Sequence, residues 1–227
     1  DHFHVIQELN RRVDRVRIRV QNRFRKTIKT LKPKENNKTI TPEEIVELEE
    51  ASRYYYVLKK FNWLLASTNK KILDVNVERR FNRTLNRYLN YSEILAYMLN
   101  IDDELEEAFY LRNDVTYFYD HCTYDTAKKQ LEKIIIDFRS STVAEVSPFA
   151  NTLTNWKKEI INSFIIVDDN VNRKMNTAIV ENRNKSIKLI KHASNGYLNW
   201  ERFRNRILYT LNEDTTFYYT SIRKDGK

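Results

Sequence analysis

The sequence has 227 residues, with 40 lysines and arginines against 31 aspartates and glutamates, a net charge of +9 and a pI near 9.4. It contains 2 glycines, 3 prolines and 1 cysteine, which excludes glycine-rich phosphate-binding loops, disulfide scaffolds and cysteine-rich zinc sites. So few turn-forming residues predict a mainly α fold of long helices, and the basic excess favours a nucleic-acid partner or belongs to an ordinary soluble basic protein.

The N-terminal residues show the clearest pattern. Apolar residues recur at steps of three and four from Val5 to Ile28, which predicts a long amphipathic helix. The positions between them carry many basic residues: Arg11, Arg12, Arg15, Arg17, Arg19, Arg23, Arg25, Lys26 and Lys29. This basic face is either a solvated surface or a surface that follows the phosphates of a nucleic acid.

The next segment, residues 33–40, is polar and is predicted to be a loop. A second helix then begins at Thr41-Pro42-Glu43-Glu44, where Thr is the N-cap, Pro takes the first position and Glu completes a capping box. It is expected to end at about Ala66. Further helices are predicted at residues 75–88, 92–100, 103–119 and 123–139.

Aromatic residues are frequent in this middle region: Tyr54, Tyr55, Tyr56, Tyr88, Tyr91, Tyr97, Tyr110, Tyr117, Phe118, Tyr119 and Tyr124. Their rings either pack between helices with a solvated hydroxyl or stack on the bases of a nucleic acid. Packing is the interpretation we favour.

The C-terminal third is also expected to be helical. Ser147-Pro148 begins a helix whose buried side is predicted to hold Leu153, Trp156, Ile160 and Phe164. Residues 167–173 read as a loop, and a helix from about Thr177 to His192 stops near Asn195-Gly196. Asn199 caps a last helix, with Trp200, Phe203, Ile207 and Leu211 inward and Arg202, Arg204 and Arg206 outward.

Four polar residues of the helix predicted at 177–192 are spaced so that they share one face. Glu181, Asn184, Lys185 and Lys188 lie at steps of three, four and seven. A carboxylate there could hold a metal ion while the lysines grip phosphates. The alternative is an ordinary surface ion pair between Glu181 and Lys185.

Residues 181–191 and 195–208 resemble the C-terminal signature of the ISL-three family of bacterial transposases, which reads E-x-x-N-x-x-I-K-x-x-K-R and then G-[YF]-x-N-[FW]-x-x-F-R-x-R. The first five residues, Asp1-His2-Phe3-His4-Val5, resemble the family's D-R-F-H-V motif, with His2 in place of Arg. Residues 156–160 resemble a weaker family element. The resemblance extends over the whole chain.

This resemblance implies a ribonuclease H-like (α/β) catalytic core. Asp1, at the end of a strand, would be the second catalytic carboxylate and Glu181 the third. The two are 180 residues apart, so the core would be interrupted by an all-helical insertion. The implied division is a core segment with the long basic helix at residues 1–32, the insertion at 33–150, a returning core segment at 151–212 and a flexible tail at 213–227. The resemblance implies that the first Asp and a DNA-binding domain lie upstream, and the chain opens without an initiator Met, as expected if its start is cut.

The resemblance also implies a two-metal site for Mg²⁺ or Mn²⁺, with Asp1 and Glu181 as ligands. DNA would be contacted by Lys188, Lys185, Asn184, Arg183, Lys191 and Arg204. His2 or His4 could add a ligand, although His4 is more typical of a packing or hydrogen-bonding residue. The partners would be double-stranded transposon ends and target DNA, bound by a homo-oligomer in the active transpososome.

The implied function is metal-dependent DNA strand cleavage and strand transfer at insertion-sequence ends, by an enzyme of which this chain is a fragment, inactive alone. The fragment is expected to expose apolar residues such as Val5, Val13 and Val20. Alternatives are a non-catalytic helical DNA-binding remnant of a decayed transposase, or a helical protein-interaction module. The lone Cys122 predicts a cytoplasmic protein, and the lack of a long apolar run predicts that no segment spans a membrane. The resemblance implies association with the bacterial nucleoid.

Overall fold

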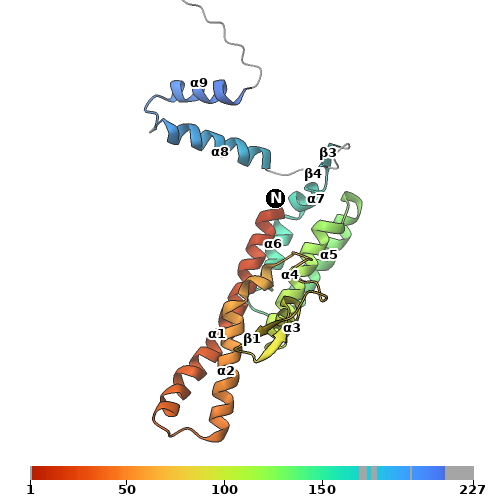
Figure 1. Cartoon of the computed structure of the whole chain (residues 1–227). Helices are drawn as coiled ribbons and strands as arrows, with labels where there is room; N and C mark the ends of the chain where they lie inside the picture. The colour runs from red at the N-terminus through yellow and green to blue at the C-terminus, as the bar shows by residue number, and fades with distance from the viewer. Residues whose placement is uncertain (1, 169–172, 175–177, 195, 213–227) are drawn as a thin grey trace, which may run out of the picture. The chain divides into compact units, whose positions relative to one another are not determined.

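The computed structural model describes residues 2–168, 173–174, 178–194 and 196–212, and these residues are mainly helical, as predicted (Figure 1). The α-helices are α1 His2–Asn36, α2 Pro42–Lys60, α3 Tyr91–Leu99, α4 Asp103–His121, α5 Tyr124–Ser140, α6 Phe149–Asn155, α7 Lys157–Asn162, α8 Ala178–Ala193 and α9 Trp200–Leu211. A 3-10 helix, η1, covers Asn62–Ala66. Two antiparallel pairs join β1 Arg80–Asn82 to β2 Arg87–Leu89 and β3 Ile166–Asp168 to β4 Arg173–Lys174.

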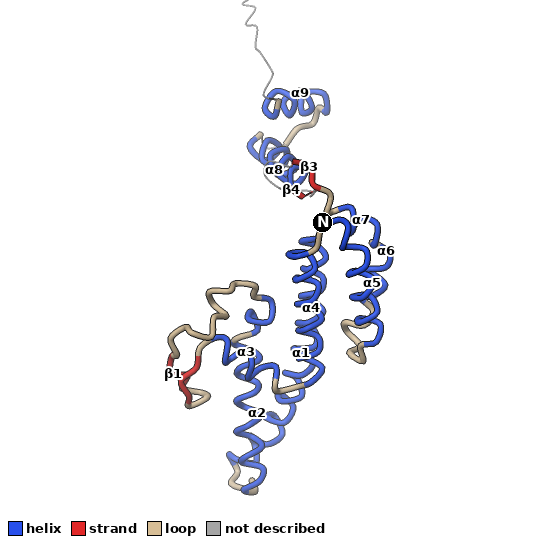
Figure 2. The backbone as a smooth tube through the Cα atoms, turned by 90° about the vertical axis from the view of Figure 1, so that its right-hand side faces the viewer, coloured by secondary structure: helices blue, strands red, loops and turns tan. Residues whose placement is uncertain are grey.

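The chain divides into two compact units, Asp1–Met175 and Asn176–Lys227. In the first unit α1 packs along α2, η1 and α4; Figures 1 and 2 both show α1 and α2 side by side. The division into core segments, insertion and tail remains a prediction, and the expected tail at residues 213–227 lies outside the described residues. No helix among the described residues is long and apolar enough to cross a membrane.

The apolar stripe of α1 lies in the core of the first unit. Leu9, Val16 and Val20 are fully buried and Val13 nearly so, while Val5 packs partly buried against them. Burial of each such side chain stabilises the fold by about 1.5–3 kcal/mol. The expectation that Val5, Val13 and Val20 are exposed in this chain was therefore wrong, because α2 and α4 cover the stripe.

The end of α1 differs from the predicted polar loop. The helix continues through Pro33, which lies in its last turn. It ends where Lys38 adopts a left-handed backbone with φ of 54°. The Thr39 amide donates to the Lys34 carbonyl at 2.9 Å and the Lys38 amide to the Glu35 carbonyl at 3.1 Å. This is a Schellman ending, in which Lys38 takes the position usually occupied by glycine.

The start of α2 confirms the predicted capping box. The Thr41 hydroxyl accepts from the Glu44 amide at 3.3 Å, and the Glu44 carboxylate accepts from the Thr41 amide at 3.1 Å. Lys34 also pairs with Glu44 across the α1–α2 turn. The pairing with Lys34, and then the Thr41 amide, lower the pKa of Glu44.

The helix predicted at residues 75–88 was wrong, because much of this segment forms the β1–β2 hairpin. Phe81 lies opposite Tyr88 in the register. At the turn, the Asn82 side chain accepts from the backbone amides of Thr84 and Leu85, both at 3.1 Å. Asn86 has a positive φ of 50°. Asparagine tolerates this left-handed conformation, which lets the chain reverse between β1 and β2 and is incompatible with a continuous helix.

The single helix predicted after Ser147-Pro148 is two short helices, α6 and α7, which meet at Trp156. Leu153, Ile160 and Phe164 are buried as predicted, but the side chain of Trp156 is 58% exposed. Because the helix is interrupted at Trp156, this residue no longer shares a face with Leu153 and Ile160, and its ring lies outside the core. The loop predicted at residues 167–173 contains the last two residues of β3 and the beginning of β4.

The second unit is a helical hairpin of α8 and α9, close to the predicted bounds. Gly196 has φ of 95°, and its amide donates to the Lys191 carbonyl at 3.0 Å, as expected of a helix stop. Asn199 caps α9 by accepting from the Arg202 amide at 3.0 Å. The residues predicted to face inward on α9 are half-buried, except Trp200, which is 67% exposed.

Candidate functional site

The carboxylate and the two lysines singled out on α8 lie on its exposed side. Glu181, Lys185 and Lys188 are all exposed. Two half-buried apolar residues of α8, Ile187 and Ile190, lie on the opposite side, and α8 packs against α9. Helical spacing therefore brings Glu181, Lys185 and Lys188 together on one outward face. Asn184 and Lys191 are also exposed and lie at the edge of the same face.

Arg183 lies on a different side of α8. Its guanidinium donates to the carbonyl of Leu211 in the last turn of α9 at 2.7 Å. The last carbonyls of a helix have no partner within the helix, so Arg183 satisfies one of them and ties the two helices together. Its predicted contact with DNA would compete with this bond.

The arginines of α9 are exposed, as predicted. Arg202, Arg204 and Arg206 all reach solvent, and the Arg206 guanidinium lies 5.7 Å from the centroid of the Tyr209 ring. Together with the lysines of α8 they make the second unit strongly basic on its surface. This density of cations suits a polyanion.

Asp1, the other predicted catalytic residue, lies outside the described residues. The residues that follow it begin α1 at once, so His2 to Val5 are helical and not part of a strand. The ring centroids of His2 and Tyr119 are 5.6 Å apart, and those of Phe3 and His4 5.5 Å. Within the described part of the chain, no group of three His, Cys, Asp or Glu side chains is placed to hold a metal ion.

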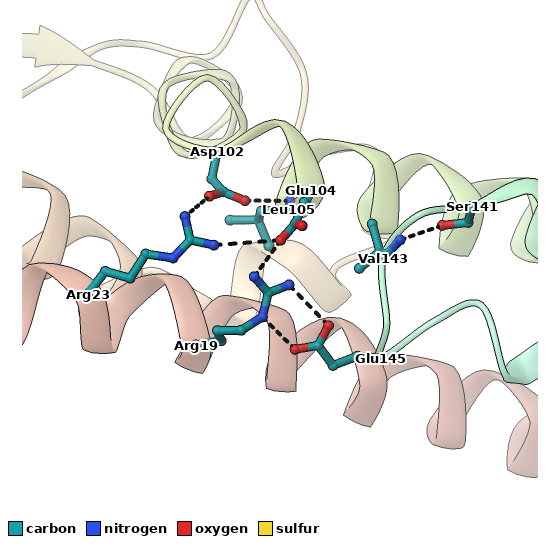
Figure 3. Close-up of polar contacts among 8 residues, drawn as sticks. All are labelled: Arg19, Arg23, Asp102, Glu104, Leu105, Ser141, Val143 and Glu145. Atoms are coloured by element: carbon teal, nitrogen blue, oxygen red, sulfur yellow. Dashed lines mark hydrogen bonds and ion pairs between the residues drawn. The ribbon is translucent and has the colours of Figure 1, made fainter.

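The basic residues of α1 divide into two sets, of which the first is engaged inside the fold. Arg17 is buried and donates to Asp14, Gln21 and the Leu58 carbonyl. Arg19 and Arg23 form a network with acidic residues beyond α1 (Figure 3). Arg12 pairs with Glu8 and the Glu145 carbonyl. These side chains are engaged in contacts within the first unit that hold its helices together.

The second set faces solvent. The exposed members that form no ion pair within the described residues are Arg15, Arg25, Lys26, Lys29 and Lys32. They lie opposite the buried stripe of α1, over 18 residues from Arg15 to Lys32, or roughly 25 Å of helix. Asn22, Arg25, Lys26 and Lys29 line a shallow hollow of about 300 Å³. This outward basic face of α1 is a candidate surface for phosphates.

Sequence analysis missed one basic cluster because it lies in the segment wrongly predicted as a helix. Arg79, Arg80, Arg83 and Arg87 stand on or beside the β1–β2 hairpin and are exposed. The alternation in Arg80-Phe81-Asn82 and Arg87-Tyr88-Leu89, separated by an asparagine-containing turn, is the pattern that would have indicated a hairpin. The predicted packing of the aromatic residues is confirmed only in part, because Tyr88, Tyr91, Tyr110, Tyr117 and Tyr124 are exposed.

Comparison with protein families decides the identity of the chain. The model of a transposase family, the ISL-three family of DDE transposases, matches residues 1–207. The chain belongs to this transposase family. Its membership gives transposition as the process and DNA as the partner, in agreement with the resemblance and with the basic surfaces of both units. Among curated proteins and among solved structures, no match to the chain was found.

Proposed function

We propose that this chain forms part of the catalytic core of a transposase that cleaves and transfers DNA strands at insertion-sequence ends, with Glu181 as a catalytic carboxylate. The observation that carries the proposal is the exposed face of α8. There Glu181, Lys185 and Lys188 lie together inside the segment matched by the transposase family. A carboxylate that can hold a metal ion, beside cations that can bind phosphates, suits metal-dependent phosphodiester chemistry.

The donor chemistry of this face suits a divalent metal. Carboxylate oxygens are the ligands that Mg²⁺ and Mn²⁺ prefer, and Glu181 is exposed in the first turn of α8. We propose Asp1 as a further ligand, with its carboxylate within roughly 10 Å of that of Glu181, as a two-metal centre requires. Bound there, the ions would activate the attacking oxygen and stabilise the leaving one. The family pattern has three carboxylates, so we propose that the first comes from outside this sequence, in a ribonuclease H-like sheet.

The cations of α8 would position the DNA strand. Lys185 follows Glu181 by four residues and Lys188 by seven, so the two ammonium groups lie on the same face as the carboxylate, one and two turns further along the helix. They would bind the backbone phosphates next to the scissile bond, and the Asn184 amide would donate to a phosphate or sugar oxygen. Arg204 and Lys191 would extend the contact. We propose a homo-oligomer bound to both transposon ends as the active assembly.

The experiment is a strand-cleavage assay on terminal-repeat DNA with Mg²⁺ or Mn²⁺, using the product of the complete reading frame. Glu181→Gln and Asp1→Asn should each abolish cleavage while DNA binding stays within a few-fold of the unmodified protein. The matched control is Glu201→Gln, which removes another exposed carboxylate from the first turn of a helix in the same unit. Equal activity of the Glu181→Gln and Glu201→Gln variants would exclude Glu181 as a metal ligand.

A second candidate function is DNA binding without catalysis, as in the remnant of a decayed element. The outward basic face of α1 favours it, because Arg25, Lys26 and Lys29 need no metal to bind phosphates. The same assay separates the two functions. Salt-dependent DNA binding with no cleavage from the complete reading frame, under either metal, would identify the non-catalytic protein.

A further inference from the structure

A cavity of about 610 Å³ lies between the β1–β2 hairpin and the helices α2 and α3. Its volume falls in the range of ligand sites that proteins use for small molecules. Four aromatic residues contribute to its wall: Tyr56 and Phe61 near the end of α2, Phe81 on β1 and Tyr91 at the start of α3. Phe81 is 50% and Tyr91 38% exposed, so their rings are accessible from solvent.

The cations of the cavity lie among these rings. Lys60, Arg80 and Arg83 line it, and Glu78 is the acidic residue among the lining side chains. Within the described part of the chain, Arg80 and Arg83 form no ion pair. A cavity with aromatic surface and unpaired guanidinium groups matches a ligand that has a flat ring and a phosphate.

The cavity is built by contacts that hold its walls in place without a ligand. The buried Asn90 side chain donates to the carbonyls of Val75 and Val77, at 3.0 and 3.2 Å, while it caps α3. Arg79 pairs with Glu93 in the first turn of α3. These bonds fix the segment before β1 against α3, so the shape of the cavity is largely formed in advance.

Tyr56 connects the opposite wall to the hairpin. Burial alone would raise the pKa of the Tyr56 hydroxyl, but its hydrogen bonds with Lys60, Thr84 and Asn82 outweigh burial and lower this pKa. The Lys60 ammonium lies 5.2 Å from the centroid of the Tyr56 ring. The hydroxyl edge of the Tyr56 ring is therefore held by polar groups, with the Lys60 ammonium 3.0 Å from the hydroxyl oxygen, which orders the ring for stacking.

We propose that this cavity binds one unstacked nucleotide of the DNA, with its base against the aromatic wall and its phosphates at Arg80 and Arg83. The inference rests on DNA being the partner of the family, and it adds a site remote in sequence from Glu181. The nucleotide could come from a single-stranded end or from a base turned out of a duplex. Both sources present the same chemistry, a base with a free face next to a phosphate.

The test measures binding of DNA that carries the fluorescent base 2-aminopurine by the product of the complete reading frame, without metal. One probe is a blunt perfect duplex, the second carries 2-aminopurine in a mismatch, and the third carries it in a three-nucleotide overhang. Stacking of one base on aromatic side chains contributes about 1–3 kcal/mol, or roughly 5- to 150-fold in affinity. We expect the mismatch or overhang probe to bind at least about 10-fold tighter than the blunt duplex. The tighter of the two identifies the source of the nucleotide.

Two pairs of variants test the residues. Phe81→Ala should reduce the ratio of the affinity for the unstacked probe to that for the blunt duplex to about 1. Tyr110→Ala, which removes an exposed ring from α4, should leave this ratio unchanged. Arg83→Gln should weaken the unstacked probes more than the blunt duplex. Arg87→Gln removes the same charge from β2, outside the cavity lining, and should weaken all probes equally. The altered side chains are exposed, so thermal unfolding should be unchanged.

Equal affinity of the unmodified protein for all probes would overturn the inference, as would equal effects of Phe81→Ala and Tyr110→Ala. Either result leaves the proposed catalytic function standing, since binding is measured without metal and the cavity is not part of the carboxylate site. If no probe binds at all, the DNA-binding role and the inference both fail. If instead the protein does not cleave DNA but still prefers the unstacked probes, the proposed catalytic function fails and the nucleotide-binding inference stands.

Discussion

Arg19 holds Glu145 in a two-pronged ion pair that joins residues 126 positions apart. The guanidinium Nε lies 2.6 Å from one carboxylate oxygen and Nη2 lies 3.0 Å from the other. The same guanidinium also bonds to Glu104 (Figure 3). Arg19 therefore connects α1 to the first turn of α4 and to the turn before α6. This planar geometry is specific to arginine and stronger than a single surface pair.

Glu145→Gln should lower the free energy of unfolding at neutral pH by about 1–2 kcal/mol. The hydrogen bond from Arg19 lowers the pKa of Glu145, against the opposing effect of burial. A carboxylate with a lowered folded-state pKa stabilises the fold above its unfolded pKa of about 4.3, and this contribution is lost as pH falls through the folded-state value. The difference between the proteins should therefore shrink in acid.

Urea unfolding from pH 7 down to pH 3 measures this difference. The control is Glu47→Gln on α2, an exposed residue without an ion pair in the described part of the chain, which should change stability little at any pH. A Glu145→Gln effect that stays constant with pH would show that the interaction with Arg19 is not ionic.

Arg112 should be among the most sensitive positions of the first unit. Its side chain is 2% exposed and donates to Asn10 at 2.9 Å, to Asn113 at 2.9 Å and to the Ala66 carbonyl at 2.7 Å. Burial lowers the pKa of the guanidinium. Arg112→Ala would leave a cavity and an unsatisfied Ala66 carbonyl, and should cost about 3 kcal/mol or more.

Arg112→Met distinguishes the two parts of this cost. It removes the same charge and the same hydrogen bonds as Arg112→Ala but fills most of the volume, so it should be less destabilising than Arg112→Ala. The exposed Arg53→Ala variant on α2 serves as the reference for removal of an arginine. An Arg112→Ala effect no larger than that of Arg53→Ala would contradict a structural role for Arg112.

The helical elements could be predicted from sequence where the apolar period and the cap agreed. The Thr41 capping box and the Asn199 cap gave correct starts because each bond is local to four residues. The end of α1 could not be predicted in this way, because the positive φ of Lys38 depends on a chain reversal that packs α2 on α1. The hairpin at Asn82 and Asn86 was missed because its aromatic and arginine residues also fit a short helical period.

The candidate site was partly predictable for the same reason. Spacing alone placed Glu181, Lys185 and Lys188 on one exposed face of a helix. Nothing local distinguishes Arg183 from them, because its partner, the Leu211 carbonyl, lies 28 residues along the chain. The sequence likewise could not show which basic residues of α1 are paired and which face solvent, because Arg19 and Arg23 meet Glu104 and Asp102 only when α4 packs on α1.

The outward basic face of α1 should bind duplex DNA without sequence preference. Replacing Arg25, Lys26 and Lys29 together with Gln should weaken binding and lower the log–log salt slope by about 0.9 for each phosphate that is no longer neutralised. The control replaces Lys128 and Lys129 on α5, which are exposed and carry the same kind of charge. Affinity measured by anisotropy over a salt series separates the two. If both variants lose the same affinity per charge removed, the loss reflects net charge alone, and the α1 face is not a specific DNA-binding surface.

The final prediction separates binding from structure within α8. Lys185→Gln and Lys188→Gln should lower DNA affinity and the salt slope but leave thermal stability unchanged, because both side chains are exposed. Arg183→Gln should instead loosen the α8–α9 hairpin, because it removes the 2.7 Å bond to the Leu211 carbonyl. Hydrogen exchange of the α8 and α9 amides should report this as faster exchange confined to residues 178–212. If Arg183→Gln leaves exchange unchanged and weakens DNA binding as much as Lys185→Gln does, Arg183 acts on the DNA and its bond to α9 is dispensable.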